Sequence, residues 1–158
     1  MGAAKLVRDV GDTVISVAIS DDDSMFAAGS TNKKTVVYSS STGETVATFV
    51  AKAGVNAVVF AGVGSATRVL AGTFNSQLCM WHINANAAEP ECELTFGGDA
   101  VLSMAVGARG TRLAVGGAKS HVAVYAIDIP RETFTDFSDD PSAAPPAGSL
   151  VELYRVAP

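Results

Sequence analysis

Histidine and cysteine are scarce in this 158-residue sequence, which contains two of each. Neither His82 nor His121 has a serine or cysteine nucleophile and an acid at a recognisable spacing, so no catalytic triad is indicated. Cys79 and Cys92 form no CxxC pair and have no set of histidine ligands around them, which predicts two reduced thiols. We therefore expect a protein that is not an enzyme and that has no catalytic residues, metal or cofactor.

Charged residues are also few, at 17% of the chain, whereas apolar residues make up 48%. This balance predicts a folded domain with a sizeable core. The net charge of −5 argues against nonspecific binding to the phosphates of nucleic acid. No apolar run reaches about 18 residues, and the N-terminus lacks the apolar segment of a signal peptide. We expect no membrane association and a cytoplasmic location, with the nucleus as an alternative.

What the sequence does contain is a repeated pattern of short β-type runs separated by turn residues. The clearest copy has runs at Val14–Ile19, Met25–Ser30, Thr35–Tyr38 and Thr45–Phe49, which predict a four-stranded antiparallel meander. A glycine in the second run and an aromatic residue in the third mark each copy. The glycines are Gly29, Gly72 and Gly116, spaced by 43 and 44 residues, and Tyr38, Trp81 and Tyr125 each follow nine residues later. Three segments therefore share one internal register.

The first run of each copy is apolar on both faces, which predicts a strand buried on both sides. These runs are Val14–Ile19, Val55–Phe60 and Val101–Val106. Within each run, one face carries larger side chains than the other. Sheets stacked around a common axis need that asymmetry, because their inner strands interdigitate there.

The pattern resembles the WD40-repeat β-propeller family, whose units have about 40 to 45 residues and four strands. The resemblance rests on SVAISDDDSMFAAGSTNKKTVVYSSSTGETVATF, NAVVFAGVGSATRVLAGTFNSQLCMWHI and SMAVGARGTRLAVGGAKSHVAVYAI. The family's Gly-His before its first strand is replaced by Gly11-Asp12, Ala53-Gly54 and Gly97-Gly98-Asp99, and Trp81 is followed by His82 where the family has Asp.

The resemblance implies an all-β fold of about three four-stranded antiparallel blades that form an incomplete ring. We expect a single domain over residues 1–158, with blades at residues 11–49, 50–96 and 97–156. Residues 126–149 are rich in acids and proline and predict a long loop between the last two strands. Leu6–Val10 is expected to be an outer strand of an incomplete blade or an unpaired arm. Since closed propellers need at least four blades, we expect edge-to-edge self-association or further blades from a longer chain.

Two stretches have an alternative interpretation. Asp21, Asp22 and Asp23 could bind a hard cation, but no glycine-pivoted ligand loop follows, and a turn between strands is the better account. The GxG at Gly62–Gly64 follows a strand, as in a dinucleotide site. The third glycine is missing, however, and Arg68–Thr73 has the character of a strand, so we expect no nucleotide there.

The resemblance implies a non-catalytic protein–protein interaction scaffold that presents loops to a peptide or subunit. Three alternatives remain open at this point. The first is an enzyme that uses a propeller's central cavity, although the loops supply few acids or histidines. The second is a phosphoinositide-binding propeller, whose paired-arginine motif the sequence lacks. The third is a truncated fragment with no independent function.

Charge separates between the two ends of the predicted blades. Successive turns of a meander alternate ends, so the loops before the first strand and between the second and third strands share one rim. Those loops hold four of the five lysines, beside only two acids, Asp12 and Asp99, and the opposite rim is acidic. We expect the basic rim to bind an acidic or phosphorylated segment of a protein partner. The predicted partner-binding residues are Lys33, Lys34, Lys52, Asn75, Asp99, Lys119 and His121.

Overall fold

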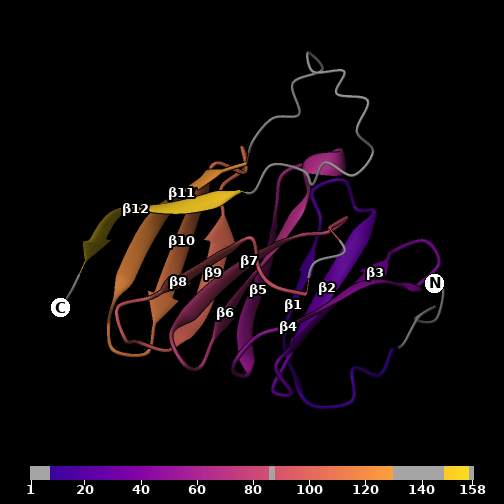
Figure 1. The fold of residues 1–158 in the computed structure, drawn as a ribbon, viewed down its shortest axis with the longest axis horizontal. Coiled ribbons are helices and arrows are strands. Elements are labelled where there is room, and N and C mark those ends of the chain that lie inside the picture. The colour runs from indigo at the N-terminus through magenta and orange to yellow at the C-terminus, as the bar shows by residue number, and fades with distance from the viewer. Residues whose placement is uncertain (1–7, 86–87, 130–147, 157–158) are drawn as a thin grey trace, which may run out of the picture.

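The computed structural model describes residues 8–85, 88–129 and 148–156, which form three four-stranded antiparallel sheets (Figure 1). Blade 1 contains β1 (Val14–Ile19), β2 (Met25–Ser30), β3 (Lys34–Ser39) and β4 (Thr45–Val50). Blade 2 contains β5 (Val55–Ala61), β6 (Arg68–Thr73), β7 (Gln77–His82) and β8 (Cys92–Thr95). Blade 3 contains β9 (Val101–Val106), β10 (Arg112–Gly117), β11 (Val122–Asp128) and β12 (Ser149–Val156).

Each blade is a meander in which strands neighbouring in sequence are paired. The three blades lie side by side in chain order, from the indigo end to the yellow end of Figure 1. The only helix in the described residues is η1 (Gly64–Ala66), a single 3₁₀ turn. The predicted all-β fold of three antiparallel blades is therefore confirmed. In the described part of the chain, no helix is long and apolar enough to cross a membrane.

The blades pack on one another mainly through their first strands. β5 lies on β1 and β2 of blade 1, and β9 lies on β5 and β6 of blade 2. Between blades 1 and 2, Phe49 stacks on Trp81 with ring centroids 5.3 Å apart, beside Val58 and Phe60. Blade 2 is covered on both faces, and every residue of β6 is buried. The apolar character of both faces in this part of the sequence explains that burial.

Residues 8–10 are not a strand and lie over the free face of blade 1. The Arg8 Nε donates a hydrogen bond to the Gly43 carbonyl at 2.6 Å, and Asn32 Nδ2 donates to the Val10 carbonyl at 3.1 Å. Val10 packs against a cluster that contains Val36 and Tyr38. The described part of Leu6–Val10 therefore does not form the outer strand of another blade, and residues 6–7 lie outside the described residues.

Two loops differ in detail from the prediction. β11 continues to Asp128, so the long connection within blade 3 spans 129–148 rather than 126–149, and residues 130–147 of it lie outside the described residues. After Gly62, η1 is only three residues long and β6 follows almost at once. Gly62 has φ +79°, and a side chain there would lie 2.5 Å from the Ala66 carbonyl oxygen. The glycine thus serves a tight turn.

The acidic run after β1 is a turn organised by Asp22. Its Oδ1 accepts hydrogen bonds from the hydroxyls of Ser24 and Ser20, both at 2.7 Å, and from the Ser24 N–H at 3.0 Å. The hydrogen bonds from the Ser24 and Ser20 hydroxyls lower the pKa of Asp22 to about 2. The carboxylate therefore closes the turn between β1 and β2.

Candidate partner-binding rim

Three turns and the segments that enter β1, β5 and β9 lie together at one end of the blades. We call this end the basic rim, made of turns 31–34, 74–77 and 118–121 and of segments 11–13, 51–54 and 97–100. Backbone hydrogen bonds join turn to segment in every blade. These bonds run from Thr31 N–H to the Thr13 carbonyl at 3.1 Å, from Phe74 N–H to the Gly54 carbonyl at 3.0 Å, and from Ala118 N–H to the Ala100 carbonyl at 3.1 Å.

The three turns share one backbone conformation. Lys33, Ser76 and Ser120 each lie four residues after the glycine that marks their copy of the repeat, and their φ values are +72°, +73° and +68°. A positive φ is uncommon in residues other than glycine and costs on the order of 1 kcal/mol. In blade 1, the Lys33 N–H donates to the Ser30 carbonyl at 3.2 Å, and Ser76 repeats this bond in blade 2. The turns therefore present their side chains on equivalent backbone frames.

Three of the four predicted lysines have no acidic partner in the described part of the chain. Lys33, Lys34 and Lys119 are exposed and form no ion pair with any residue that the structure describes. Lys52 differs, because its Nζ lies 2.6 Å from Glu93 Oε1 on β8. That hydrogen bond raises the pKa of Lys52. Glu93 was not among the predicted rim residues, and its carboxylate makes the basic charge at this position smaller than the sequence predicts.

Asp99 and His121 meet at the blade 3 end of the basic rim. Asp99 is fully buried, and its Oδ2 accepts a hydrogen bond from the Lys119 N–H at 2.8 Å and lies 3.1 Å from His121 Nδ1. Burial raises the pKa of Asp99, but the hydrogen bonds from Lys119 and His121 outweigh it and hold the pKa below its ordinary value. Gly117 leaves room for this carboxylate, because an added side chain would overlap it. Asp99 therefore positions the Lys119 turn.

Asn75 is exposed at the tip of the blade 2 turn. Its Oδ1 accepts a hydrogen bond from Thr73 Oγ1 at 2.6 Å, and Thr73 Oγ1 accepts one from the Gln77 N–H at 3.0 Å. The amide oxygen is thus used within the turn. Asn75 Nδ2 donates to no group among the described residues.

We expect the Lys119 turn to loosen in acid through protonation of Asp99. A carboxylate with a lowered pKa stabilises the fold above its ordinary value of 3.8, and this contribution is lost as the pH falls through the lowered value. The Lys119 amide proton resonance should therefore show a step as the pH falls below 3.8. In Asp99→Asn the same resonance should lose that step, and a step that persisted in this variant would contradict the assignment.

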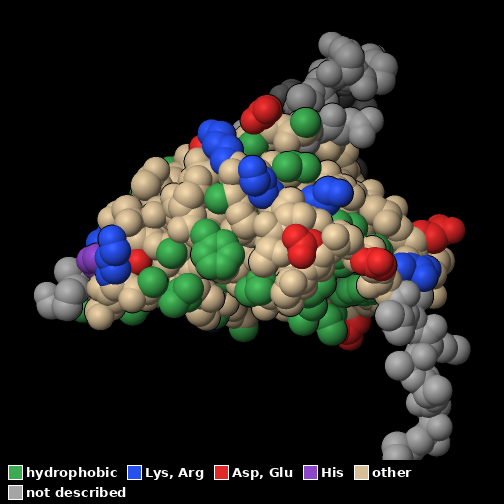
Figure 2. All heavy atoms as spheres, turned by 90° about the horizontal axis from the view of Figure 1, so that it is seen from below, with side chains coloured by type: hydrophobic (Ala, Val, Ile, Leu, Met, Phe, Trp, Pro, Cys, Tyr) green, Lys and Arg blue, Asp and Glu red, His purple; other side chains and the backbone are tan. Residues whose placement is uncertain are grey.

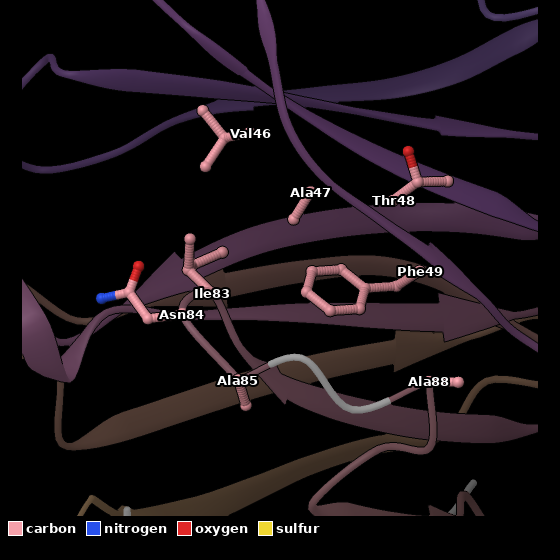
Figure 3. A pocket seen from close by; sticks show the side chains of 8 residues that line it. All are labelled: Val46, Ala47, Thr48, Phe49, Ile83, Asn84, Ala85 and Ala88. Carbon is pink, nitrogen blue, oxygen red and sulfur yellow. The ribbon is translucent and has the colours of Figure 1, made fainter. Parts of the chain in front are cut away.

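A separate pocket of about 390 Å³ lies between β4 and the segment after β7 (Figure 3). Val46, Ala47 and Phe49 line one side of it, and Ile83 and Asn84 line the other. Its remaining lining residues are Thr48, Ala85 and Ala88. None of these eight side chains is an acid, a base or a nucleophile, so they offer no group for proton transfer or covalent chemistry.

Comparison with known proteins shows similarity of fold. No protein-family model and no curated protein sequence matches the chain. Among solved structures, the chain is similar to the β-propeller protein Hsv2 of Kluyvelomyces marxianus, with a TM-score of 0.64 at 13% sequence identity. The match covers 92% of this chain and 46% of that one, so the chain spans about half the length of Hsv2. The likeness shows a partial β-propeller.

Proposed function

We propose that the chain is a non-catalytic protein–protein interaction scaffold of the WD40 type, whose basic rim binds an acidic or phosphorylated segment of a partner. The observation that supports this proposal is the set of three exposed lysines, Lys33, Lys34 and Lys119, which lie on one rim without acidic partners among the described residues. The two turns that carry them have the same backbone conformation. An excess of charge of one sign steers an oppositely charged partner toward a surface. We propose the cytoplasm as the location, with the nucleus as the alternative.

The described side chains with reactive groups favour a scaffold over an enzyme. Burial raises the pKa of Cys79 to about 12, so its thiol is protonated at neutral pH and is a poor nucleophile. Asp99 Oδ2 accepts a hydrogen bond from the Lys119 N–H and lies within hydrogen-bond distance of His121 Nδ1, so Asp99 serves to hold the turn in place. The pocket of Figure 3 has no titratable lining residue.

Charge reversal at the rim tests the proposal. We expect the triple variant Lys33→Glu, Lys34→Glu and Lys119→Glu to bind acidic and phosphorylated peptides with an on-rate lower by roughly tenfold at low salt, because steering by charge is lost. The difference should shrink as salt is added, because screening weakens the attraction in the original protein. The measurement is surface binding kinetics against an array of acidic and phosphorylated peptides at several salt concentrations.

Two further variants serve as controls. Arg109→Glu reverses one charge, as each of the three lysine substitutions does, at an exposed position in the β9–β10 turn on the opposite rim, and should leave the on-rate unchanged. Lys33→Gly removes one lysine and relieves its positive φ, so it should weaken binding without weakening the fold. If the on-rate ignored the lysine changes, or fell equally with Arg109→Glu, the basic rim would not be the binding surface.

A further inference from the structure

The joint between blades 1 and 2 is built around a glycine. A side chain on Gly29 would lie 2.6 Å from Val55 Cγ1 and 2.8 Å from Val58 Cγ1, so the two valines occupy the space above that glycine. The Val58 N–H also donates a hydrogen bond to Ser16 Oγ at 3.1 Å across the joint. The first strand of one blade thus inserts two side chains over a glycine of the preceding blade.

The joint between blades 2 and 3 repeats this arrangement at equivalent positions. Strand register places Gly72 where Gly29 lies, and Val101 and Met104 where Val55 and Val58 lie. A side chain on Gly72 would overlap Val101 and come within 3.3 Å of Met104 Sδ. Asn56 Nδ2 adds a hydrogen bond to the Val101 carbonyl at 2.8 Å. The glycine and the pair of inserted side chains are therefore the recurring unit of blade packing here.

Blade 3 carries the same glycine, but no described side chain is inserted above it. A Cβ added to Gly116 would meet no described atom within 4 Å. We call the surrounding face the Gly116 socket, which contains Ser103, Ala105, Ala114, Gly116 and Val124. By strand register these positions match Ser16, Ala18, Ala27, Gly29 and Val37 of blade 1, with the same residue type at all five. In blade 2 the matching residues are Ala57, Val59, Leu70, Gly72 and Met80, and only the glycine is shared.

The Gly116 socket is open, whereas its counterpart on blade 1 is covered. Ser103, Ala105 and Ala114 are exposed, but Ala27, Gly29 and Val37 are buried beneath blade 2. A hollow of about 450 Å³ lies over one part of the socket, where Ala105, Ala114 and Val124 are among its lining residues, and it does not extend to Ser103 or Gly116. Ser103 makes no hydrogen bond through its hydroxyl with any described group, whereas Ser16 accepts one from blade 2. Among the described residues, blade 3 therefore offers a free hydroxyl acceptor at Ser103 and an open face around Gly116.

The opposite end of the chain carries two valines that match the socket. Register places Val14 and Val17 of β1 where Val55 and Val58 lie in β5, and their side chains are 43% and 70% exposed. Hydrophobic side chains also gather along the lower edge of the molecule in Figure 2. Residues 8–10 pack on the β2 and β3 side chains of this face. β1 is equivalent to β5 and β9, the strands that enter the two internal joints. Both of its valines, Val14 and Val17, are nevertheless exposed.

We propose that the Gly116 socket of one chain receives Val14 and Val17 of a second copy. The joint would repeat the one between blades 1 and 2, which has the same residue types on the socket and the same two valines in the inserted strand. Ser103 Oγ would accept the Val17 N–H as Ser16 accepts that of Val58. Two copies joined at both ends close a ring of six blades, within the four to eight that propellers use. The proposal is independent of peptide binding at the basic rim.

The test compares self-association of the full chain with that of matched variants. Sedimentation equilibrium of the original protein is expected to show a dimer that dissociates on dilution. Gly116→Val fills the socket at a position where an added Cβ would meet no described atom within 4 Å, and Val17→Glu places a charge on the inserted strand, so each should weaken dimerisation at least about tenfold. Val50→Glu makes the same change at a position of blade 1 that is 56% exposed on β4, and it should dimerise normally.

Mixing the two defective variants separates this joint from any other. Val17→Glu retains a working socket and Gly116→Val retains working valines, so a mixture should form heterodimers through one intact joint while neither variant dimerises alone. Circular dichroism of each variant checks that the β fold is kept. A protein that stays monomeric at every concentration would overturn the proposal, and so would a dimer that survives Gly116→Val or a mixture that stays monomeric.

Discussion

Alanine at Gly72 is expected to destabilise the fold by on the order of 3 kcal/mol, the upper part of the usual range for an overpacked core. The added methyl would overlap Val101 and press on Met104 at 3.3 Å, so β9 would have to move away from blade 2. Gly29→Ala should be destabilising for the same reason, since its methyl would lie 2.6 Å from Val55 Cγ1. Neither glycine has a positive φ, so the cost arises from packing between blades.

The matched control is Gly116→Ala, which makes the same change at the equivalent position of blade 3. Its methyl meets nothing within 4 Å, and alanine is favoured over glycine in a strand interior by roughly 0.5 kcal/mol, so this variant should be slightly more stable. Urea unfolding measures all three variants, at a protein concentration where the chain is monomeric. Equal losses at the three positions would mean that the glycines serve their own strands and not the joints.

Glu91→Ala is expected to cost about 3 kcal/mol because it removes the carboxylate that pairs with the buried Arg68 guanidinium. Arg68 is 2% exposed and Glu91 is 12% exposed, with Arg68 Nε donating to Glu91 Oε1 at 2.8 Å. Arg68 Nη1 also donates to the Ala66 carbonyl at 2.7 Å. Without the carboxylate, the guanidinium must either stay in a poorly solvated site or pull β6 open.

An exposed pair of the same blade provides the comparison. Glu93→Ala removes the partner of Lys52, which is 64% exposed, and should cost much less stability than Glu91→Ala. The double variant Arg68→Met and Glu91→Leu should recover much of the stability that Glu91→Ala loses, because it removes both charges. Thermal and urea unfolding distinguish these cases. A loss after Glu91→Ala no larger than that after Glu93→Ala would show that the buried pair contributes little.

The strands were predictable from the sequence because each carries its own signal. Val14–Ile19, Met25–Ser30 and Arg68–Thr73 were predicted with the bounds that the structure has, and β3 and β4 extend the prediction by a residue at Lys34, Ser39 and Val50. The repeated glycine and aromatic residue reveal register within a blade, because strand pairing is local in a meander. Alternation along each strand then assigns side chains to faces, except where the register shifts, as it does between Val14 and Ser16 in β1 and between Val55 and Ala57 in β5.

The side-chain partners at the rim could not be predicted in the same way. Lys52 and Glu93 are 41 residues apart, and Asp99 and His121 are 22 apart, so each pair depends on how a loop folds back on a strand or turn. Alternation assigns a face to a strand residue, but it does not say which loop residue reaches it. The sequence did contain one signal for the Asp99–His121 pair. Asp99 stands before β9, where the resembled family has a histidine, and a histidine, His121, follows β10.

The order of the blades also has a consequence for how the molecule opens. Every blade is a contiguous stretch of chain, and the main strand contacts among the described residues join neighbouring blades, so the protein behaves as a short linear array with local contacts. Unfolding an end blade breaks one interface, whereas unfolding blade 2 breaks two. Fluctuations therefore begin at the termini and reach β6 last, which makes its amide protons the slowest to exchange. A closed ring has no end blade, so closure would remove the sites where opening starts.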